Sequence, residues 1–206
     1  MKDPKIKWPG DSEKKQFLNA TGLTVDQTED RITRAISKGE KMAKRGLNHI
    51  QPILDEKRSR WEACWNADKT LKKWFGKVTK ANHVKDVFRR LENAYDRLSD
   101  KTLTIKIKAD LPNDYSAMNN GSFLSPKTFQ VGPDWFDNPI NERGSVVIHE
   151  LLHEWFIDQK IDGEIVYGAT LAKKLADKEP KKARKSPENY EHYCLDLHNS
   201  TDRYQS

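Results

Sequence analysis

The sequence predicts an α+β fold that is mainly helical, with a small sheet beside one buried helix. Apolar residues recur at helical spacing over most of the chain, and one short stretch alternates apolar and polar side chains. Six Trp, seven Phe and six Tyr supply bulky core material that disordered chains lack. With 206 residues, the chain is long enough to bury a core of ordinary size.

Helical spacing dominates the first half of the chain. Apolar residues recur every three or four positions over residues 26–56, and the same spacing continues over residues 61–76 and 84–98. Residues 1–26 mix charges with Pro and Gly and contain only short apolar pieces, which is typical of an arm or linker. We therefore expect an N-terminal arm at residues 1–26 and a single domain over residues 27–206, beginning with a helical bundle.

The period changes in the second half. Residues 102–108 alternate apolar and polar side chains and predict a half-buried strand, and residues 128–132 predict a second short strand. Asn and Gly at residues 119–121 indicate a turn between these strands. The sequence thus predicts a small sheet.

A buried helix is expected after the sheet. Residues 145–156 are apolar on most sides, and Gly144 and Ser145 indicate where this helix begins. Two further helices are expected near residues 165–177 and 187–199.

Composition excludes several classes of protein. Lys and Arg total 37 against 31 Asp and Glu, so the formal net charge is +6, spread along the chain. No apolar run approaches the roughly 18 residues that cross a bilayer, and no hydrophobic stretch follows the first residues. Cys64 and Cys194 are too few for a disulfide framework. We expect a chain without membrane span or Sec-type signal peptide, made in the cytoplasm.

The strongest chemical signal is the run His149-Glu150-Leu151-Leu152-His153. Residues four apart on a helix share one face, so both imidazoles can bind one Zn²⁺ ion while Glu150 lies beside the open coordination position. The ion lowers the pKa of a water molecule toward about 7, and Glu150 can accept its proton as general base. The alternative is a buried polar cluster, but ionisable groups among apolar residues favour a bound cation.

A catalytic zinc usually has a third protein ligand, and no His follows within a dozen residues. A carboxylate is therefore expected, and four lie close enough in the sequence: Glu154, Asp158, Asp162 and Glu164.

The segment from His149 to Glu191 resembles the aspzincin (deuterolysin-like) zinc metalloendopeptidases, most closely their peptidyl-Lys metalloendopeptidase branch. These proteins carry the two-His helix, a ligand aspartate three residues before Tyr-Gly, and an acidic segment further on. Here Tyr167 and Gly168 match the Tyr-Gly pair, which places Glu164 where the family has its aspartate. The resemblance implies a zincin-like metallopeptidase fold and zinc-dependent cleavage of peptide bonds.

The resemblance also implies roles for individual residues. Tyr167 would donate a hydrogen bond to the oxyanion formed during cleavage. Glu164 is our preferred third ligand, although the separation from His153 fits Asp162 better, and both alternatives stay open. Glu188 and Glu191 match the acidic segment that holds a lysine ammonium after the cut bond, and an exposed, acidic helix start is the alternative.

Three biological readings follow from these patterns. The first is an endopeptidase acting on proteins or peptides, used as a bacterial toxin or effector, exported by a specialised secretion system and blocked by an immunity or inhibitor protein. The second is a zinc hydrolase directed at peptidoglycan. The third is a basic nucleic-acid-binding module without catalysis, disfavoured because the lysine-rich residues 173–185 lack interleaved aromatics. The histidines outside the motif, His49, His83, His192 and His198, are expected on the surface or supporting the site.

Overall fold

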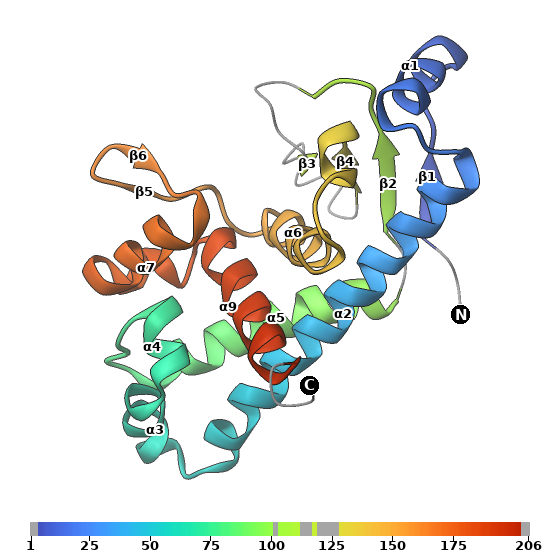
Figure 1. Cartoon of the computed structure of the whole chain (residues 1–206). Helices are drawn as coiled ribbons and strands as arrows, with labels where there is room; N and C mark the ends of the chain where they lie inside the picture. Colours follow the sequence, from blue (N-terminus) through green and yellow to red (C-terminus); the bar gives the residue numbers. More distant parts are fainter. Residues whose placement is uncertain (1–3, 101–102, 112–116, 119–127, 203–206) are drawn as a thin grey trace. The chain divides into compact units, whose positions relative to one another are not determined.

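The computed structural model describes residues 4–100, 103–111, 117–118 and 128–202 (Figure 1). The chain divides into two compact units, which are described separately. Unit 1 comprises Met1–Glu40 and Asp96–Glu154, and unit 2 comprises Lys41–Tyr95 and Trp155–Ser206. The turn expected at residues 119–121 lies outside the described residues.

Two long helices, α2 (Val25–Asp55) and α5 (Ala81–Ser99), contribute residues to both units. Thr24 and Gln27 form a reciprocal capping box at the start of α2, because each backbone N–H donates to the other side chain, at 2.9 and 3.2 Å. Both helices bury the apolar positions that predicted them, including Ile36 and Leu91. The helical periodicity of the first half is thus confirmed.

Four strands among the described residues of unit 1 form one sheet, in the order β1-β2-β4-β3. They are β1 (Lys5–Lys7), β2 (Thr104–Ile107), β3 (Ala117–Met118) and β4 (Thr128–Val131). β1 and β4 pair parallel with β2, and β3 pairs antiparallel with β4. β2 and β4 are the two predicted strands, and their inward side chains, Ile105 and Phe129 among them, are buried.

The first residues form part of unit 1 rather than an extended arm. β1 lies at the edge of the sheet, and α1 (Asp11–Thr21) follows it. Phe17 of α1 is fully buried, with its ring edge-to-face against Phe136 at 5.4 Å between centroids. The expected arm is therefore wrong for this segment, because a strand of only three residues and one buried aromatic leave little periodic signal. The expectation of a single domain over residues 27–206 stays a prediction.

Helix α6 (Ile140–Leu152) follows the short 3-10 helix η3 (Pro133–Phe136) and contacts the sheet through β3 (Figure 1). The small sheet beside a buried helix is therefore confirmed. The helix begins at Ile140, however, and not near Gly144. Gly144 is an interior residue of α6. A residue without a side chain is needed there because α2 approaches closely, and a Cβ at this position would lie 3.0 Å from the Gly39 nitrogen. The Ser145 hydroxyl donates to the carbonyl of Glu142 and does not cap the helix.

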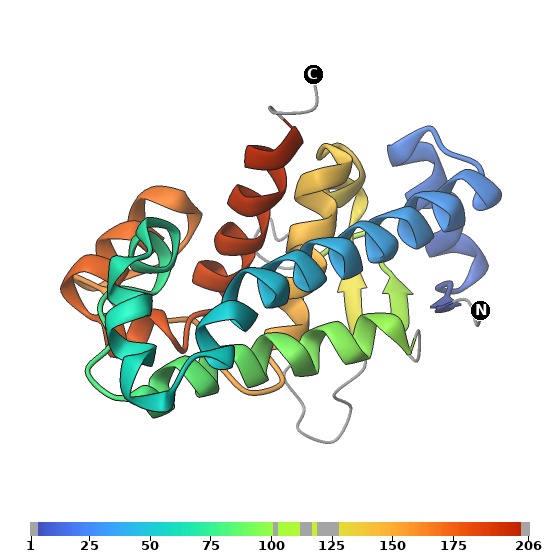
Figure 2. The ribbon, with the colours of Figure 1, turned by 90° about the horizontal axis from the view of Figure 1, so that it is seen from below.

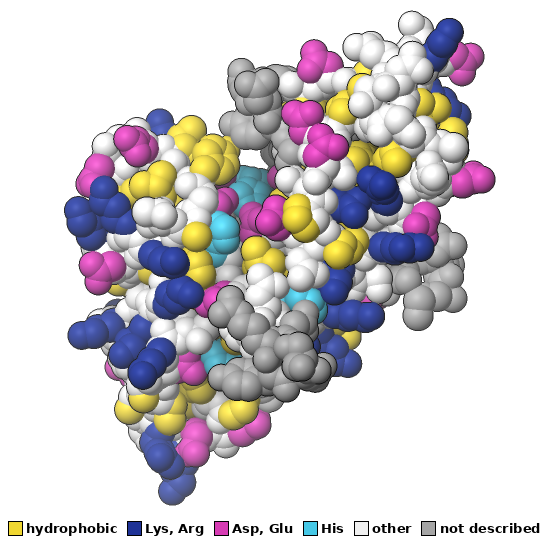
Figure 3. Space-filling model, viewed as in Figure 1, with side chains coloured by type: hydrophobic (Ala, Val, Ile, Leu, Met, Phe, Trp, Pro, Cys, Tyr) yellow, Lys and Arg dark blue, Asp and Glu magenta, His cyan; other side chains and the backbone are white. Residues whose placement is uncertain are grey.

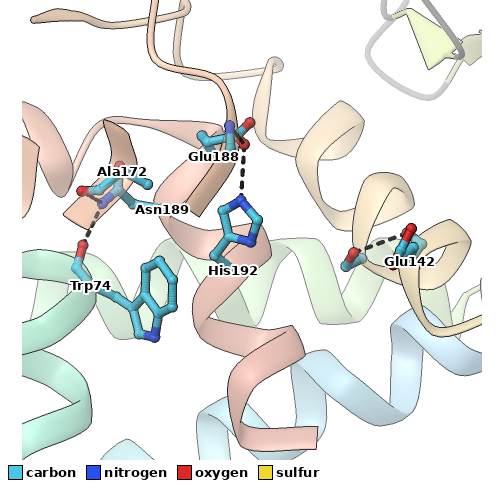
Figure 4. A network of polar contacts seen from close by, with 8 residues as sticks. Trp74, Glu142, Ala172, Glu188, Asn189 and His192 are labelled. Atoms are coloured by element: carbon cyan, nitrogen blue, oxygen red, sulfur yellow. Dashed lines mark hydrogen bonds and ion pairs between the residues drawn. The ribbon is translucent and has the colours of Figure 1, made fainter. Parts of the chain in front are cut away.

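Unit 2 is built mainly from short helices packed on one another. They are η1 (Arg58–Arg60), α3 (Trp61–Ala67), α4 (Lys69–Phe75), α7 (Gly168–Lys178), α8 (Pro180–Ala183) and α9 (Pro187–Asp202). Figure 2 shows α4 and α7 side by side. The side-chain amide of Asn189 in α9 donates to the carbonyls of Trp74 and Ala172, at 2.6 and 2.8 Å, and so ties α9 to α4 and α7 (Figure 4). The two helices expected near the end of the chain are confirmed.

A two-stranded hairpin of β5 (Lys160–Ile161) and β6 (Glu164–Ile165) precedes α7. Asp162 and Gly163 form its turn, both with positive φ, 52° and 89°. None of the helices in the described ranges has the length and apolar character needed to pass through a membrane.

Candidate active site

The motif predicted to bind zinc lies at the end of α6 in unit 1. His149 and Glu150 are buried, and His153, the residue that caps the helix, is half-buried and retains helical φ and ψ of −62° and −11°. Helical geometry therefore extends over the whole motif. It places the Nε2 atoms of His149 and His153 3.0 Å apart, so the two imidazoles converge on one point.

These residues fit a zinc ion. One ligand atom from each of His149, Glu150 and His153 lies within 4.8 Å of the others. Two ligands of a tetrahedral zinc ion, each at about 2.0–2.1 Å, stand roughly 3.3 Å apart, close to the separation of the two Nε2 atoms. Imidazole nitrogens with a neighbouring carboxylate are also a donor set that zinc prefers.

Apolar packing and one ion pair hold the end of α6 in place. Val147, Ile148, Leu151 and Leu152 are all buried around the motif. The carboxylate of Glu154, just after the helix, lies 2.9 Å from the guanidinium of Arg97 and is 8% exposed. Because this carboxylate is engaged by Arg97, Glu154 is a poor candidate for the third zinc ligand.

The two preferred candidates for the third ligand lie in the β5–β6 hairpin of unit 2. Asp162 is bound by Lys174 at 2.7 Å, with Lys178 at 3.6 Å, and the hydrogen bond from Lys174 and the two positive charges lower the pKa of its carboxyl. Glu164 is the first residue of β6, and its side chain is exposed. Asp162 therefore has lysine partners within its own unit.

Tyr167 immediately precedes α7, and its side chain is 41% exposed. Its hydroxyl lies 3.4 Å from Oδ2 of Asp158, another of the candidate carboxylates. The phenol is therefore exposed at the start of a helix and not buried in the core, and it can donate a hydrogen bond outward.

The Tyr-Gly pair and the acidic segment, twenty residues apart in sequence, meet in unit 2. The backbone N–H of Gly168, the first residue of α7, donates to Oε1 of Glu188 at 2.5 Å. This places a carboxylate at the positive end of the α7 dipole. Glu188 is buried, whereas Glu191, one turn further along α9, is half-buried.

His192 supports Glu188, which is one of the two placements expected from the sequence for the histidines outside the motif. Its Nε2 atom lies 3.0 Å from Glu188 Oε1, and its ring stacks on Trp74 with centroids 5.3 Å apart (Figure 4). The spacing of four residues between Glu188 and His192 on one helix is the sequence signal for this pair. His49 and His198 instead support the packing of unit 2, with Asp68 and Arg45 respectively.

Basic side chains do not form a continuous track on the face seen in Figure 3, where Lys and Arg are interspersed with Asp and Glu. Several lysines of the 173–185 segment are also paired with acids, as in Lys182 with Glu179 at 2.6 Å. This distribution gives no support to the nucleic-acid-binding alternative.

Comparisons with known proteins agree with the sequence motifs. The sequence model of the family described as lysine-specific metallo-endopeptidase, the aspzincins, matches residues 62–195. Among solved structures, a zinc peptidase from Grifola frondosa is similar in fold, with a TM-score of 0.65 and 15% identity over 84% of this chain and 97% of that chain. No curated protein matches the chain. Because the family match covers more than half of its residues, the chain belongs to the aspzincin family and is a zinc-dependent metalloendopeptidase.

Proposed function

We propose that the chain cleaves peptide bonds with His149, His153 and Glu164 as zinc ligands and Glu150 as general base. The observation that supports this most strongly is the 3.0 Å separation of the two Nε2 atoms at the buried end of α6, with Glu150 between them in sequence. When bound, zinc supplies Lewis acidity, polarising the substrate carbonyl and lowering the pKa of water.

In this proposal, Glu150 transfers the proton. Its carboxylate accepts a proton from the attacking water and afterwards donates it to the amine that leaves, so the residue returns to its starting state. Burial suits this role, because it keeps bulk water away from the proton while it is transferred.

Tyr167 would donate a hydrogen bond from its hydroxyl to the oxyanion of the cleaved carbonyl. Its exposure and its position before α7 leave the phenol accessible to a substrate. The assignment is matched by the Tyr-Gly pair of the family, in which Tyr167 follows the proposed ligand Glu164 by three residues.

We favour Glu164 over Asp162 as the third ligand. Asp162 is held by Lys174 and Lys178, so it would have to leave two cations to bind a metal. Glu164 keeps the three-residue spacing to Tyr167 at the expense of a glutamate in place of aspartate. The extra methylene requires only a small adjustment of the backbone.

The proposed substrate preference is for lysine immediately after the cut bond, with Glu188 and Glu191 binding the lysine ammonium. Support comes from the family match and from the burial of Glu188, since paired acids make a buried ammonium tolerable. Cleavage of a peptide library should be enriched before Lys, and Glu191→Gln should reduce this enrichment while leaving cleavage at other sites. A library cleaved without regard to Lys would contradict the preference.

For the biological setting we propose a toxin or effector exported by a specialised secretion system and held inactive by an immunity protein. The two free cysteines, Cys64 and Cys194, suit synthesis in a reducing compartment. Production of wild type and of Glu150→Gln in the cytoplasm and periplasm of a test bacterium checks this role. Growth inhibition by wild type alone supports it, and harmlessness in both compartments contradicts it.

The catalytic proposal is tested with Glu150→Gln and a matched variant, Glu142→Gln, at an exposed position of the same helix. Glu150→Gln should keep its zinc and lose peptidase activity by roughly 10²–10⁴-fold, the range typical of general-base catalysis. Glu142→Gln should keep both. Unchanged cleavage by Glu150→Gln would overturn the proposal.

A further inference from the structure

Unit 2 contains a cavity of about 450 Å³ lined mainly by basic side chains. Its walls come from the first turns of α5 and from α8 with the residues that follow it. None of the residues proposed above for catalysis lines this cavity. One carboxylate, that of Asp86, faces five cations, which are Arg89, Arg90, Lys181, Arg184 and Lys185.

Neutral groups hold two of the arginines. Arg184 donates to the backbone carbonyls of Phe75 and Lys77, at 3.3 and 3.1 Å. The Arg90 guanidinium lies over the rings of Trp155 and Phe156, 5.6 and 5.5 Å from their centroids. A ring binds the face of a guanidinium, so the N–H groups at its edge keep their geometry for an oxyanion.

Acidic partners for these cations are scarce. Arg89 lies 3.7 Å from Asp86. In the described part of the chain, no carboxylate lies within ion-pair distance of Arg90, Lys181, Arg184 or Lys185. Like charges around one cavity repel each other, and an anion in the cavity would relieve this repulsion.

His83 also lines the cavity and is half-buried. Burial lowers the pKa of its imidazole, Arg184 and Lys80 lower it further, and Asp86 and Glu62 oppose them. Its buried Nδ1 atom has no hydrogen-bond partner among the residues that the structure describes. His83 therefore provides a reporter inside the cavity, because its ring resonances respond to a nearby charge.

We propose that this cavity binds a compact ligand with two or more neighbouring oxyanion groups, of the phosphate or carboxylate class. Arginine forks match the paired oxygens of both groups, and flanking lysines add charge without demanding a fixed geometry. The volume exceeds that of a single phosphate ion, and Phe156 forms an apolar wall. A nucleic acid needs a longer basic groove with several stacking aromatics, which this cavity lacks.

The test titrates the zinc-loaded protein with pyrophosphate and, separately, with citrate. Binding is followed at the ring resonance of His83, assigned with a His83→Gln variant. Both probes also bind zinc, so variants are compared at His83 and not through peptidase activity. Tighter binding of pyrophosphate identifies a phosphoryl ligand, and tighter binding of citrate identifies a polycarboxylate; either order supports the shared oxyanion chemistry.

Two double variants make the result decisive. Lys181→Gln with Lys185→Gln changes two exposed residues of the cavity, and Lys72→Gln with Lys77→Gln removes the same charge from a second basic cavity of unit 2. The first pair should weaken binding at His83 by about tenfold or more, and the second by less than about twofold. Equal weakening by both pairs, or the absence of any probe-dependent shift at His83, would overturn the proposal.

Discussion

The proposed zinc ligands lie in two regions that differ in packing, the buried end of α6 and the exposed β5–β6 hairpin. At the end of α6, His149 and His153 are fixed by one helical turn and by buried apolar neighbours. In the hairpin, the side chains of Asp162 and Glu164 are exposed, and the directions in which they point depend on a turn whose residues have positive φ. A ligand on a packed helix is determined by spacing alone, whereas a ligand on an exposed hairpin is determined by a turn that spacing does not describe.

The largest effect is expected from a substitution at the end of α6. His153→Ala removes one of two convergent imidazoles, so zinc should be lost and proteolysis should fall below detection. Metal analysis and a peptide-cleavage assay measure the two results. His83→Gln, a histidine change outside the motif, should retain zinc and cleavage. A His153→Ala protein that keeps its zinc would show that α6 does not hold the metal.

The choice of the third zinc ligand in the hairpin is tested by comparing Glu164→Gln with Asp162→Asn. Glu164→Gln should lower zinc affinity by more than the roughly 10–100-fold expected for losing an outer-sphere partner. Asp162→Asn should leave zinc affinity nearly unchanged, because that carboxylate is bound by Lys174. Competition with a chelator measures both affinities. The reverse order would assign the ligand to Asp162.

Tyr167→Phe should affect turnover and not metal binding. Removing one oxyanion donor typically lowers kcat by roughly 10²–10³-fold, and KM should change little because the bond forms mainly in the transition state. Steady-state kinetics on a lysine-containing peptide separate the two constants. A loss confined to KM would contradict the proposed role and indicate a substrate contact.

Glycine substitutions test how α6 is backed by α2 within unit 1. A Cβ at Gly39 would lie 2.7 Å from the carbonyl oxygen of Gly144, which cannot rotate away. Gly39→Ala should therefore lower the free energy of unfolding by about 1–3 kcal/mol, measured by urea denaturation. Gly46→Ala is the matched change in α2, where the nearest atom belongs to the flexible side chain of Leu91. Equal losses of the free energy of unfolding in the two variants would indicate that the contact with the Gly144 backbone costs no more than the contact with a flexible side chain.

The smallest effect concerns Asp68, whose carboxylate lies 3.2 Å from Nε2 of His49 and accepts from the N–H of Leu71 at 2.7 Å. Burial alone would raise the pKa of Asp68, but these hydrogen bonds outweigh it and lower the pKa below 3.8. A depressed pKa in the folded state stabilises the fold above the unfolded pKa, and this stabilisation is lost as pH falls through the folded value.

Asp68→Asn keeps a good cap for α4 and removes only the charge, so it should cost less than about 1 kcal/mol at pH 7. The difference in Tm from wild type should be full at neutral pH and vanish as the pH falls below about 4. A difference that grows in acid would contradict the lowered pKa.

Local periodicity explains which parts of the fold could be predicted. The long helices, the strands β2 and β4, and the last helices each carry many residues of one period. β1 has three residues and exists because it pairs with β2, about a hundred residues away. The start of α6 was misplaced because Gly144 indicates a helix boundary locally, whereas its close contact with Gly39 is a tertiary constraint.

The same distinction holds for the site. Spacing alone predicted that His149 and His153 converge, since the constraint lies within one helix. The meeting of Gly168 with Glu188 depends on how α7 and α9 pack, whereas the contact of Glu188 with His192 follows from their spacing of four residues on α9. The lysine partners of Asp162 likewise come from the packing of the hairpin on α7, which no local pattern describes.

X-ray absorption at the zinc edge of the purified protein identifies the side chains that bind the ion. The spectrum should show a zinc ion with the scattering signature of two imidazoles and at least one carboxylate, and one imidazole contribution should be lost in His149→Ala. A wild-type spectrum without histidine scattering, or one unchanged by His149→Ala, would contradict it.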